Sequence, residues 1–81
     1  MNEALREVRR IFAEELGWSG AVEPHHALAA DLQLDSVQLL TLVVGLENRF
    51  RIALAEEDAA QVRTVADLVA LVERRRREAG R

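Results

Sequence analysis

The chain has 81 residues, enough for one small domain and too few for a multidomain enzyme. With 49% hydrophobic and 31% charged residues, its composition excludes a disordered chain. No apolar run approaches the roughly 20 residues that span a bilayer, so we expect no membrane span. The absence of cysteine excludes disulfides and thiolate metal sites. Because no signal sequence is visible near the N-terminus, we expect a cytoplasmic protein.

The formal net charge is -3, and the acidic residues are concentrated in the middle of the chain. Residues 11–48 contain six acidic residues and neither lysine nor arginine. This stretch lacks the continuous basic face that binds nucleic acid, so we expect no nucleic-acid partner. A negative surface favours protein partners that carry basic patches.

The first predicted helix covers residues 2–16. Its apolar residues recur at steps of three and four, which is the period of an amphipathic helix. They are Leu5, Val8, Phe12 and Leu16. Gly17 is expected to end this helix. Residues 18–33 show no period and contain glycine and proline, which predicts a long ordered loop anchored by Leu28 and Leu32.

A second helix is predicted to begin at Asp35 and to run to about Phe50. The Asp35 carboxylate is suited to accept hydrogen bonds from the free backbone N–H groups of the first turn. Gln38 follows three residues later and can reach back to the Asp35 N–H, which completes a capping box. The helix start is therefore marked by a local signal.

Residues 51–62 are predicted to form a connection that contains a short helix. The acidic run at residues 56–58 suits the positive N-terminus of such a helix. Thr64 and Asp67 form a second capping-box pattern, which predicts the start of a last helix. Its apolar residues are Val65, Leu68, Val69 and Val72. We expect this helix to fray over Arg74–Arg77, whose charges suit the solvent and the helix C-terminus.

No segment shows the alternating period of a strand. The sequence therefore predicts an all-α fold, a bundle of three main helices plus one short helix, with a long loop between the first two. We expect residues 1–81 to form a single domain.

The second helix carries two apolar faces. The residues of the first are expected to face the core: Leu39, Leu42, Val43, Leu46 and Phe50. Val37, Leu40 and Val44 form a separate stripe beside Ser36, flanked by Thr41 and Glu47. Either this helix is central and buries both faces, or the stripe is exposed and docks a transient partner. A docked partner would find the Ser36 hydroxyl beside it.

Residues 31–37 read DLQLDSV, which closely resembles the D-L-G-x-D-S-L signature of acyl carrier proteins. The resemblance extends to residues 8–17, 46–50 and 64–68, with the spacings expected in that family. It implies an acyl-carrier-like bundle in which Ser36 bears 4'-phosphopantetheine, a covalent group derived from coenzyme A. The thiol of this arm carries acyl groups as thioesters.

The resemblance also implies the partners. A phosphopantetheinyl transferase would attach the arm, and Asp35 would help to hold the magnesium ion of that enzyme. Acyl-loading and acyl-processing enzymes such as a ligase, a ketosynthase or an acyltransferase would use the loaded carrier, which itself catalyses nothing. We expect a monomer with its docking surface at Val37, Leu40, Thr41, Val44 and Glu47. The acyl chain can fold back among the helices in this family, which here would involve Leu46, Leu54, Ala59 and Val62.

The chain departs from the family pattern at several positions. Gln33 stands where glycine is usual, Ala55 where proline is frequent, and Gly45 lies within a predicted helix, at a cost of about 1 kcal/mol relative to alanine. The second helix is also less acidic than in carriers of general fatty acid synthesis, with Gln38, Thr41, Asn48 and Arg49 at positions that are often carboxylates there. We therefore expect a specialised fatty acid or polyketide-type pathway.

Two other functions are compatible with the sequence. An aminoacyl or peptidyl carrier shares the serine and the fold, although the D-S-V context disfavours it against an acyl carrier. An unmodified helical adaptor would use the stripe of Val37, Leu40 and Val44 alone. We expect no metal site, because His25 and His26 are adjacent in a loop without further histidine or cysteine.

Overall fold

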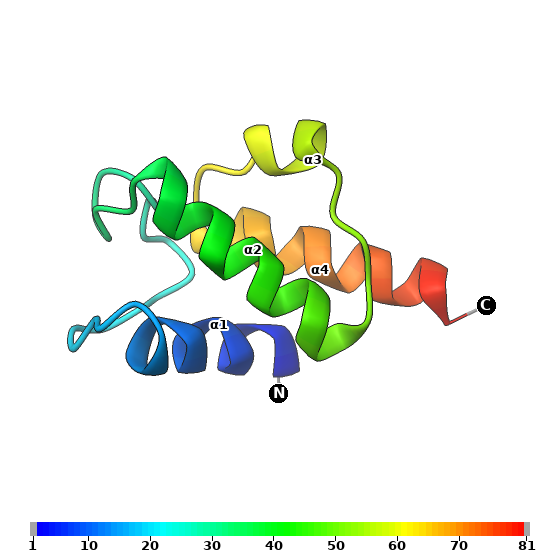
Figure 1. Ribbon diagram of the computed structural model, residues 1–81, viewed down its shortest axis with the longest axis horizontal. Helices are drawn as coiled ribbons and strands as arrows, with labels where there is room; N and C mark the ends of the chain where they lie inside the picture. The colour runs from blue at the N-terminus through cyan, green and yellow to red at the C-terminus, as the bar shows by residue number, and fades with distance from the viewer. Residues whose placement is uncertain (1, 81) are drawn as a thin grey trace.

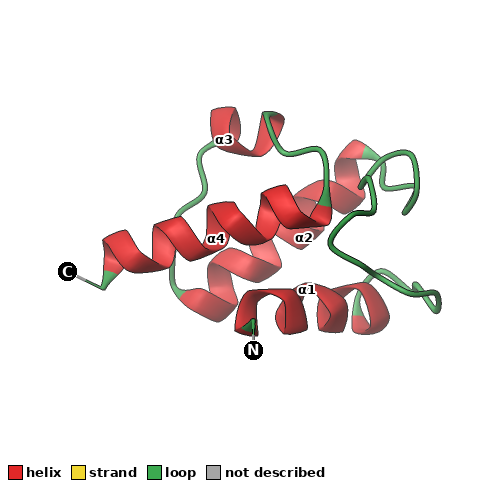
Figure 2. Ribbon diagram, turned by 180° about the vertical axis from the view of Figure 1, so that it is seen from behind, coloured by secondary structure: helices red, strands yellow, loops and turns green. Residues whose placement is uncertain are grey.

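The computed structural model describes residues 2–80, and these residues contain four helices (Figure 1). They are α1 (Glu3–Glu14), α2 (Ser36–Phe50), α3 (Glu56–Ala60) and α4 (Val65–Ala79). Figure 2 shows from behind that α1 and the short α3 lie on opposite sides of the layer made by α2 and α4. No strand occurs between residues 2 and 80. The predicted all-α bundle with one short helix is confirmed.

The core is formed by one face of each long helix. α2 contributes Leu42, Val43 and Leu46, which are buried, while Leu39 and Phe50 are partly buried and pack against the same cluster. α1 and α4 add their buried residues to the core: Ala4, Val8, Ile11, Phe12, Val65, Leu68, Val69, Leu71 and Val72. α3 contributes no buried residue, so it lies at the edge of the core.

Both predicted capping boxes are present. The Gln38 N–H donates to Asp35 Oδ1 at 2.7 Å, and the Asp35 N–H donates to Gln38 Oε1 at 3.2 Å. At α4 the Asp67 N–H donates to Thr64 Oγ1 at 3.1 Å, and the Thr64 N–H donates to Asp67 Oδ2 at 3.2 Å. These contacts satisfy backbone donors that the first turns leave free, and they fix where α2 and α4 begin.

The first helix ends two residues earlier than predicted. α1 stops at Glu14, and Gly17 adopts a left-handed conformation with φ of 66°. The Trp18 N–H donates to the Phe12 carbonyl at 2.9 Å, which satisfies one of the carbonyls left free at the end of the helix. Glycine is favoured at this position because it has no Cβ to clash in that conformation.

The expected fraying of α4 over Arg74–Arg77 is wrong, because the helix continues to Ala79. Two of its arginines are held by other helices. Arg75 pairs with Asp58 of α3, and Arg76 pairs with Glu3 of α1 at 3.0 Å. The last turn of α4 is therefore tied to both neighbours.

The long loop before α2 is joined to the start of α4 by backbone hydrogen bonds between residues 24–28 and 63–66, which we call the seam. The Leu28 N–H donates to the Arg63 carbonyl at 2.9 Å, and the Val65 N–H donates to the His26 carbonyl at 3.0 Å. Leu28 and Leu32 are buried, as predicted for the anchors of this loop. The seam brings the α3–α4 connection beside the loop that leads into α2.

Candidate functional site around Ser36

Ser36 is the first residue of α2 and is exposed to solvent. Its hydroxyl makes no hydrogen bond to any residue from 2 to 80, whereas the neighbouring Asp35 carboxylate is occupied by the capping contact with the Gln38 N–H. The Ser36 oxygen is thus accessible and free of internal partners. An accessible hydroxyl without internal partners is suited to covalent modification.

A groove of about 350 Å³ opens beside Ser36. Its lining comes from the loop before α2, the first turns of α2 and the connection before α4. The lining residues are mostly apolar: Ala27, Leu28, Ala29, Ala30, Leu34, Leu39 and Val62, with Asp35, Ser36 and Arg63. Ser36 therefore lies directly beside an apolar surface.

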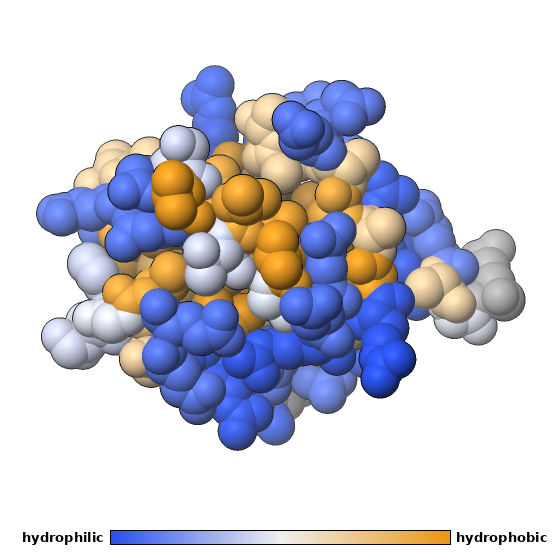
Figure 3. All heavy atoms as spheres, in the orientation of Figure 1, coloured by the Kyte–Doolittle hydropathy of each residue, from blue (hydrophilic) through white to orange (hydrophobic). Residues whose placement is uncertain are grey.

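The second apolar face of α2 is exposed. Val37 is 71% exposed, Leu40 61% and Val44 44%, which excludes the interpretation that α2 buries both of its faces. Figure 3 shows hydrophobic atoms running across this side of the molecule over α2. Contiguous exposed apolar side chains next to a functional group are typical of an interaction surface.

The two polar residues that flank this stripe make contacts within the protein. The Thr41 hydroxyl donates to the Val37 carbonyl at 3.1 Å, one turn earlier in α2. The Glu47 carboxylate accepts a hydrogen bond from the Leu54 N–H at 2.8 Å. Glu47 is half-buried and stabilises the chain after α2, a role that its place beside the stripe did not indicate.

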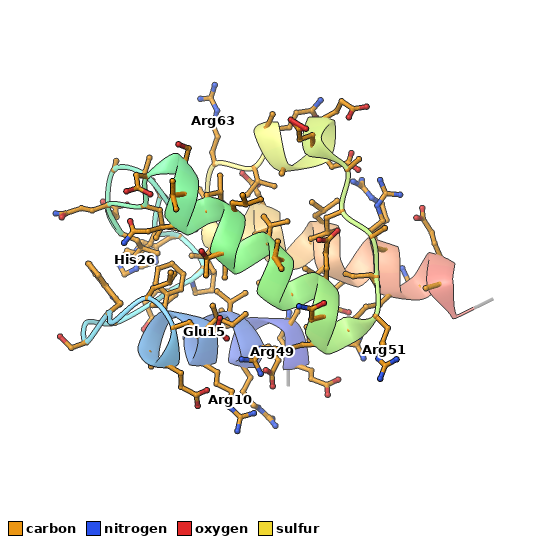
Figure 4. The ribbon with its side chains drawn as sticks, viewed as in Figure 1. Arg10, Glu15, His26, Arg49, Arg51 and Arg63 are labelled. Atoms are coloured by element: carbon orange, nitrogen blue, oxygen red, sulfur yellow. The ribbon has the colours of Figure 1, made fainter. Side chains whose placement is uncertain are left out.

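A shallow hollow of about 550 Å³ adjoins the stripe. Leu40, Thr41 and Val44 line it together with residues of α2 and the end of α1, among them Glu15 and Arg49. Arg49 pairs with Glu15 at 2.9 Å, and its other terminal nitrogen lies 3.4 Å from a Glu7 carboxylate oxygen. The side chains of Arg49 and Glu15 are labelled in Figure 4. The basic charge of Arg49 is thereby neutralised at the rim of the hollow.

The acidic charge in the middle of the chain is partly neutralised within the protein. Each of the six acidic residues between 11 and 48 accepts a hydrogen bond from another described residue. The pairs join Glu14 to Arg10, Glu15 to Arg49, Glu23 to Arg9, Asp31 to the Ala27 N–H, Asp35 to the Gln38 N–H, and Glu47 to the Leu54 N–H. Three of these carboxylates are paired with arginine, which reduces the attraction for a basic partner.

The four acyl-pocket candidates do not lie together at the groove. Leu46 and Leu54 are buried in the core, and Ala59 and Val62 are partly buried against it. Of the four, only Val62 lines the groove beside Ser36. Storage of an acyl chain among these residues stays a prediction.

The two adjacent histidines have a local role in the loop. The Glu23 N–H donates to His26 Nδ1 at 3.0 Å, and the rings of His25 and His26 are 4.5 Å apart between centroids. Within residues 2–80 no group of three or more histidine, cysteine, aspartate or glutamate side chains is placed to hold a metal ion. The helices of this part of the chain also include none with the length and apolar character needed to cross a membrane.

Sequence reasoning missed Arg63 and the groove. Arg63 directly precedes the predicted cap Thr64, and nothing in that position distinguishes it from an ordinary solvated arginine. Its place beside Ser36 depends on the seam, which joins segments far apart in the chain. The backbone N–H groups of Arg63 and Thr64 donate to the Asp67 carboxylate, and these hydrogen bonds hold the pKa of Asp67 below its ordinary value of 3.8.

Comparison with known proteins identifies the family. Residues 6–72 match the family described as "Phosphopantetheine attachment site". An acyl carrier protein of Chlamydia caviae is 34% identical over 70 residues, covering 85% of this chain and 91% of the relative. An acyl carrier protein of Solidesulfovibrio magneticus is 32% identical over 73 residues, covering 89% and 94%.

Comparison of the fold indicates the same family. The solved structure of an acyl carrier protein from Mycobacterium tuberculosis superposes with a TM-score of 0.81 at 27% identity, covering 86% of this chain and 95% of that one. The sequence relatives and the structural match thus both cover nearly the whole of this chain. The chain belongs to the acyl carrier proteins, which carry acyl groups on a covalently attached phosphopantetheine.

Proposed function

We propose that Ser36 is the attachment site of 4'-phosphopantetheine, within a single monomeric carrier domain that works in the cytoplasm. The observation that carries this proposal is the exposed Ser36 hydroxyl, which has no internal hydrogen-bond partner in the described chain and begins α2 beside the exposed stripe. Ser36 also lies within the residues matched to the phosphopantetheine family.

The attachment chemistry fits a substrate serine without a base of its own. A phosphopantetheinyl transferase directs the Ser36 oxygen at the pyrophosphate of coenzyme A, so that a new P–O bond forms as the pyrophosphate P–O bond breaks and adenosine 3',5'-bisphosphate leaves. The serine proton passes to a base on the transferase, and metal-stabilised charge assists the leaving group. The capping contact of Asp35 leaves that carboxylate exposed, so it can also face the magnesium ion of the transferase.

The stripe of Val37, Leu40 and Val44 serves as the docking surface for the transferase and for acyl-loading and acyl-processing enzymes such as a ligase, a ketosynthase or an acyltransferase. Glu47 is the only acidic residue of α2, and its carboxylate is already bound to the Leu54 N–H. Docking on this face therefore depends more on apolar contact than on charge. This supports a specialised fatty acid or polyketide-type pathway.

The attachment site is tested by intact-mass measurement. The purified chain is incubated with a promiscuous phosphopantetheinyl transferase, magnesium and coenzyme A. We expect a mass gain of one arm, which Ser36→Ala abolishes. The sequence contains one other serine, Ser19, and Ser19→Ala is the matched control that retains the gain. An unchanged mass in the parent chain, or a gain that persists in Ser36→Ala, contradicts the proposal.

The pathway is tested with the loaded carrier. We expect poor elongation of an acyl group on Ser36 by a generic fatty acid ketosynthase, compared with a carrier of general fatty acid synthesis under the same conditions. Elongation at an equal rate contradicts the specialised assignment without affecting the attachment site.

A further inference from the structure

Arg63 is the one cationic side chain that lines the groove beside Ser36. It lies in the connection between α3 and α4 and is exposed. In Figure 4 its side chain stands clear of the ribbon, near the start of α2. Its guanidinium makes neither an ion pair nor a hydrogen bond to any other residue from 2 to 80. The charge acts on the Asp67 carboxylate only through space, so the N–H donors of the guanidinium are available to a ligand.

The backbone of Arg63 is fixed on both sides. Its carbonyl accepts a hydrogen bond from the Leu28 N–H at 2.9 Å across the seam, and its N–H donates to Asp67 Oδ2 at 3.1 Å. The side chain thus starts from a defined position at the rim of the groove. Only its own rotamers have to be ordered when it binds.

An arm on Ser36 places a phosphodiester, with one negative charge, at this same rim. Asp35 also lines the groove, and its carboxylate would repel that charge. A guanidinium offers paired N–H donors that match two phosphate oxygens. Arg63 is the group of the lining that can neutralise the phosphodiester and offset the repulsion from Asp35.

We propose that Arg63 binds the phosphodiester of the arm and so positions the base of the arm over the apolar lining of the groove, an inference that rests on attachment of the arm to Ser36. The groove is lined by Leu39, whereas Leu40 belongs to the stripe. Holding the arm over the groove leaves the stripe open, so that a partner can dock while the arm is still ordered.

The arm supplies the only phosphorus atom of the loaded protein, so phosphorus NMR measures its mobility directly. Loaded parent protein, Arg63→Gln and Arg77→Gln are compared. Arg77 is exposed on α4 and forms no ion pair within residues 2–80, so its variant removes the same charge elsewhere. Backbone amide shifts of Ala29, Ala30 and Val62 between unloaded and loaded protein report contact of the arm with the groove.

In Arg63→Gln we expect slower transverse relaxation of the phosphorus and an ordered arm population lowered about two- to fivefold, the range of an exposed charge pair. The loading-induced amide shifts should decrease with it. The relaxation rate and the amide shifts of Arg77→Gln should equal those of the parent, and those of Arg63→Lys should lie between the parent and Arg63→Gln. High salt should shift the values of the parent toward those of Arg63→Gln. A purely structural role of Arg63 would not produce this salt dependence.

The two proposals fail in different ways. If intact mass shows no arm on Ser36, the attachment site is wrong and the inference about Arg63 falls with it. If Arg63→Gln loads normally but its phosphorus relaxation and amide shifts equal those of the parent, the inference alone is overturned.

Discussion

Gly45 of α2 faces Ile11 of α1 so closely that a Cβ at Gly45 would lie 2.9 Å from Ile11 Cδ1. Ile11 is completely buried, so its side chain has little room to move. The helix penalty of glycine, about 1 kcal/mol relative to alanine, is thus the cost of bringing α1 and α2 together at this point. The absence of a side chain at Gly45 allows α1 and α2 to pack closely.

Substituting Gly45→Ala should not stabilise the protein, although alanine is the better helix former. The added methyl overpacks the contact, which costs about 1 to 3 kcal/mol and outweighs the helical gain. We expect the free energy of unfolding in urea to fall by about 1 kcal/mol. In an Ile11→Val background, where Cδ1 is absent, the same change should be neutral or stabilising. Equal effects in both backgrounds would show that the two residues are not coupled.

The hydrogen bond between Glu47 and the Leu54 N–H predicts a loss of stability in Glu47→Ala. The variant leaves a part-buried backbone donor without its partner, which costs about 1 to 3 kcal/mol. Glu47→Gln keeps an acceptor oxygen and should lose less. Asn48→Ala, at the neighbouring exposed position, is the control and should change the midpoint of urea unfolding little. A Glu47→Ala variant as stable as this control would mean that the hydrogen bond to the Leu54 N–H does not stabilise the fold.

The carboxylate of Asp67 predicts a stability difference that depends on pH. Its pKa is lowered by the backbone N–H groups of Arg63 and Thr64, so the ionised form stabilises the folded state. That stabilisation is present above the ordinary pKa of 3.8 and is lost as the pH falls through the lowered value. Asp67→Asn should therefore be less stable than the parent at pH 7, and the gap should narrow below about pH 4. Urea unfolding of both proteins across this pH range tests the prediction. If the difference between their free energies of unfolding stays constant, the expected direction of the Asp67 pKa shift is contradicted.

The exposed stripe predicts a variant with normal stability and poor partner recognition. Leu40→Ser removes an exposed side chain, so the free energy of unfolding should change by no more than about 0.5 kcal/mol. Loss of about 1 kcal/mol of apolar contact with the transferase should lower kcat/KM for arm attachment about fivefold. Ala66→Ser, at an exposed position of α4, is the control for an added hydroxyl. Unchanged kcat/KM in Leu40→Ser would remove Leu40 from the docking surface.

Features encoded within a few neighbouring residues were predicted correctly from the sequence. The capping boxes at Asp35 and Thr64 each need only four consecutive residues, and both are present. The period of α2 separated its two faces, but it left open whether Val37, Leu40 and Val44 are buried. Their exposure depends on which elements cover α2, and α3 buries none of its residues.

Features that need distant residues were missed or predicted wrongly. The last turn of α4 is ordered by Arg75, whose partner Asp58 lies 17 residues away, and by Arg76, whose partner Glu3 lies 73 residues away. A pattern of consecutive arginines carries no information about such partners. The groove beside Ser36 likewise depends on Arg63, whose position is set across the seam.

The seam also has a consequence for the order of events during synthesis. One side of the surroundings of Ser36 comes from residues 27–30, but the other side comes from Val62 and Arg63, which the ribosome adds after α2 and α3. In a nascent chain in which Ser36 has just left the ribosome, the part of the groove lining formed by Val62 and Arg63 is still missing. The groove beside Ser36 is therefore complete only after residues 62 and 63 have been synthesised and have joined the seam.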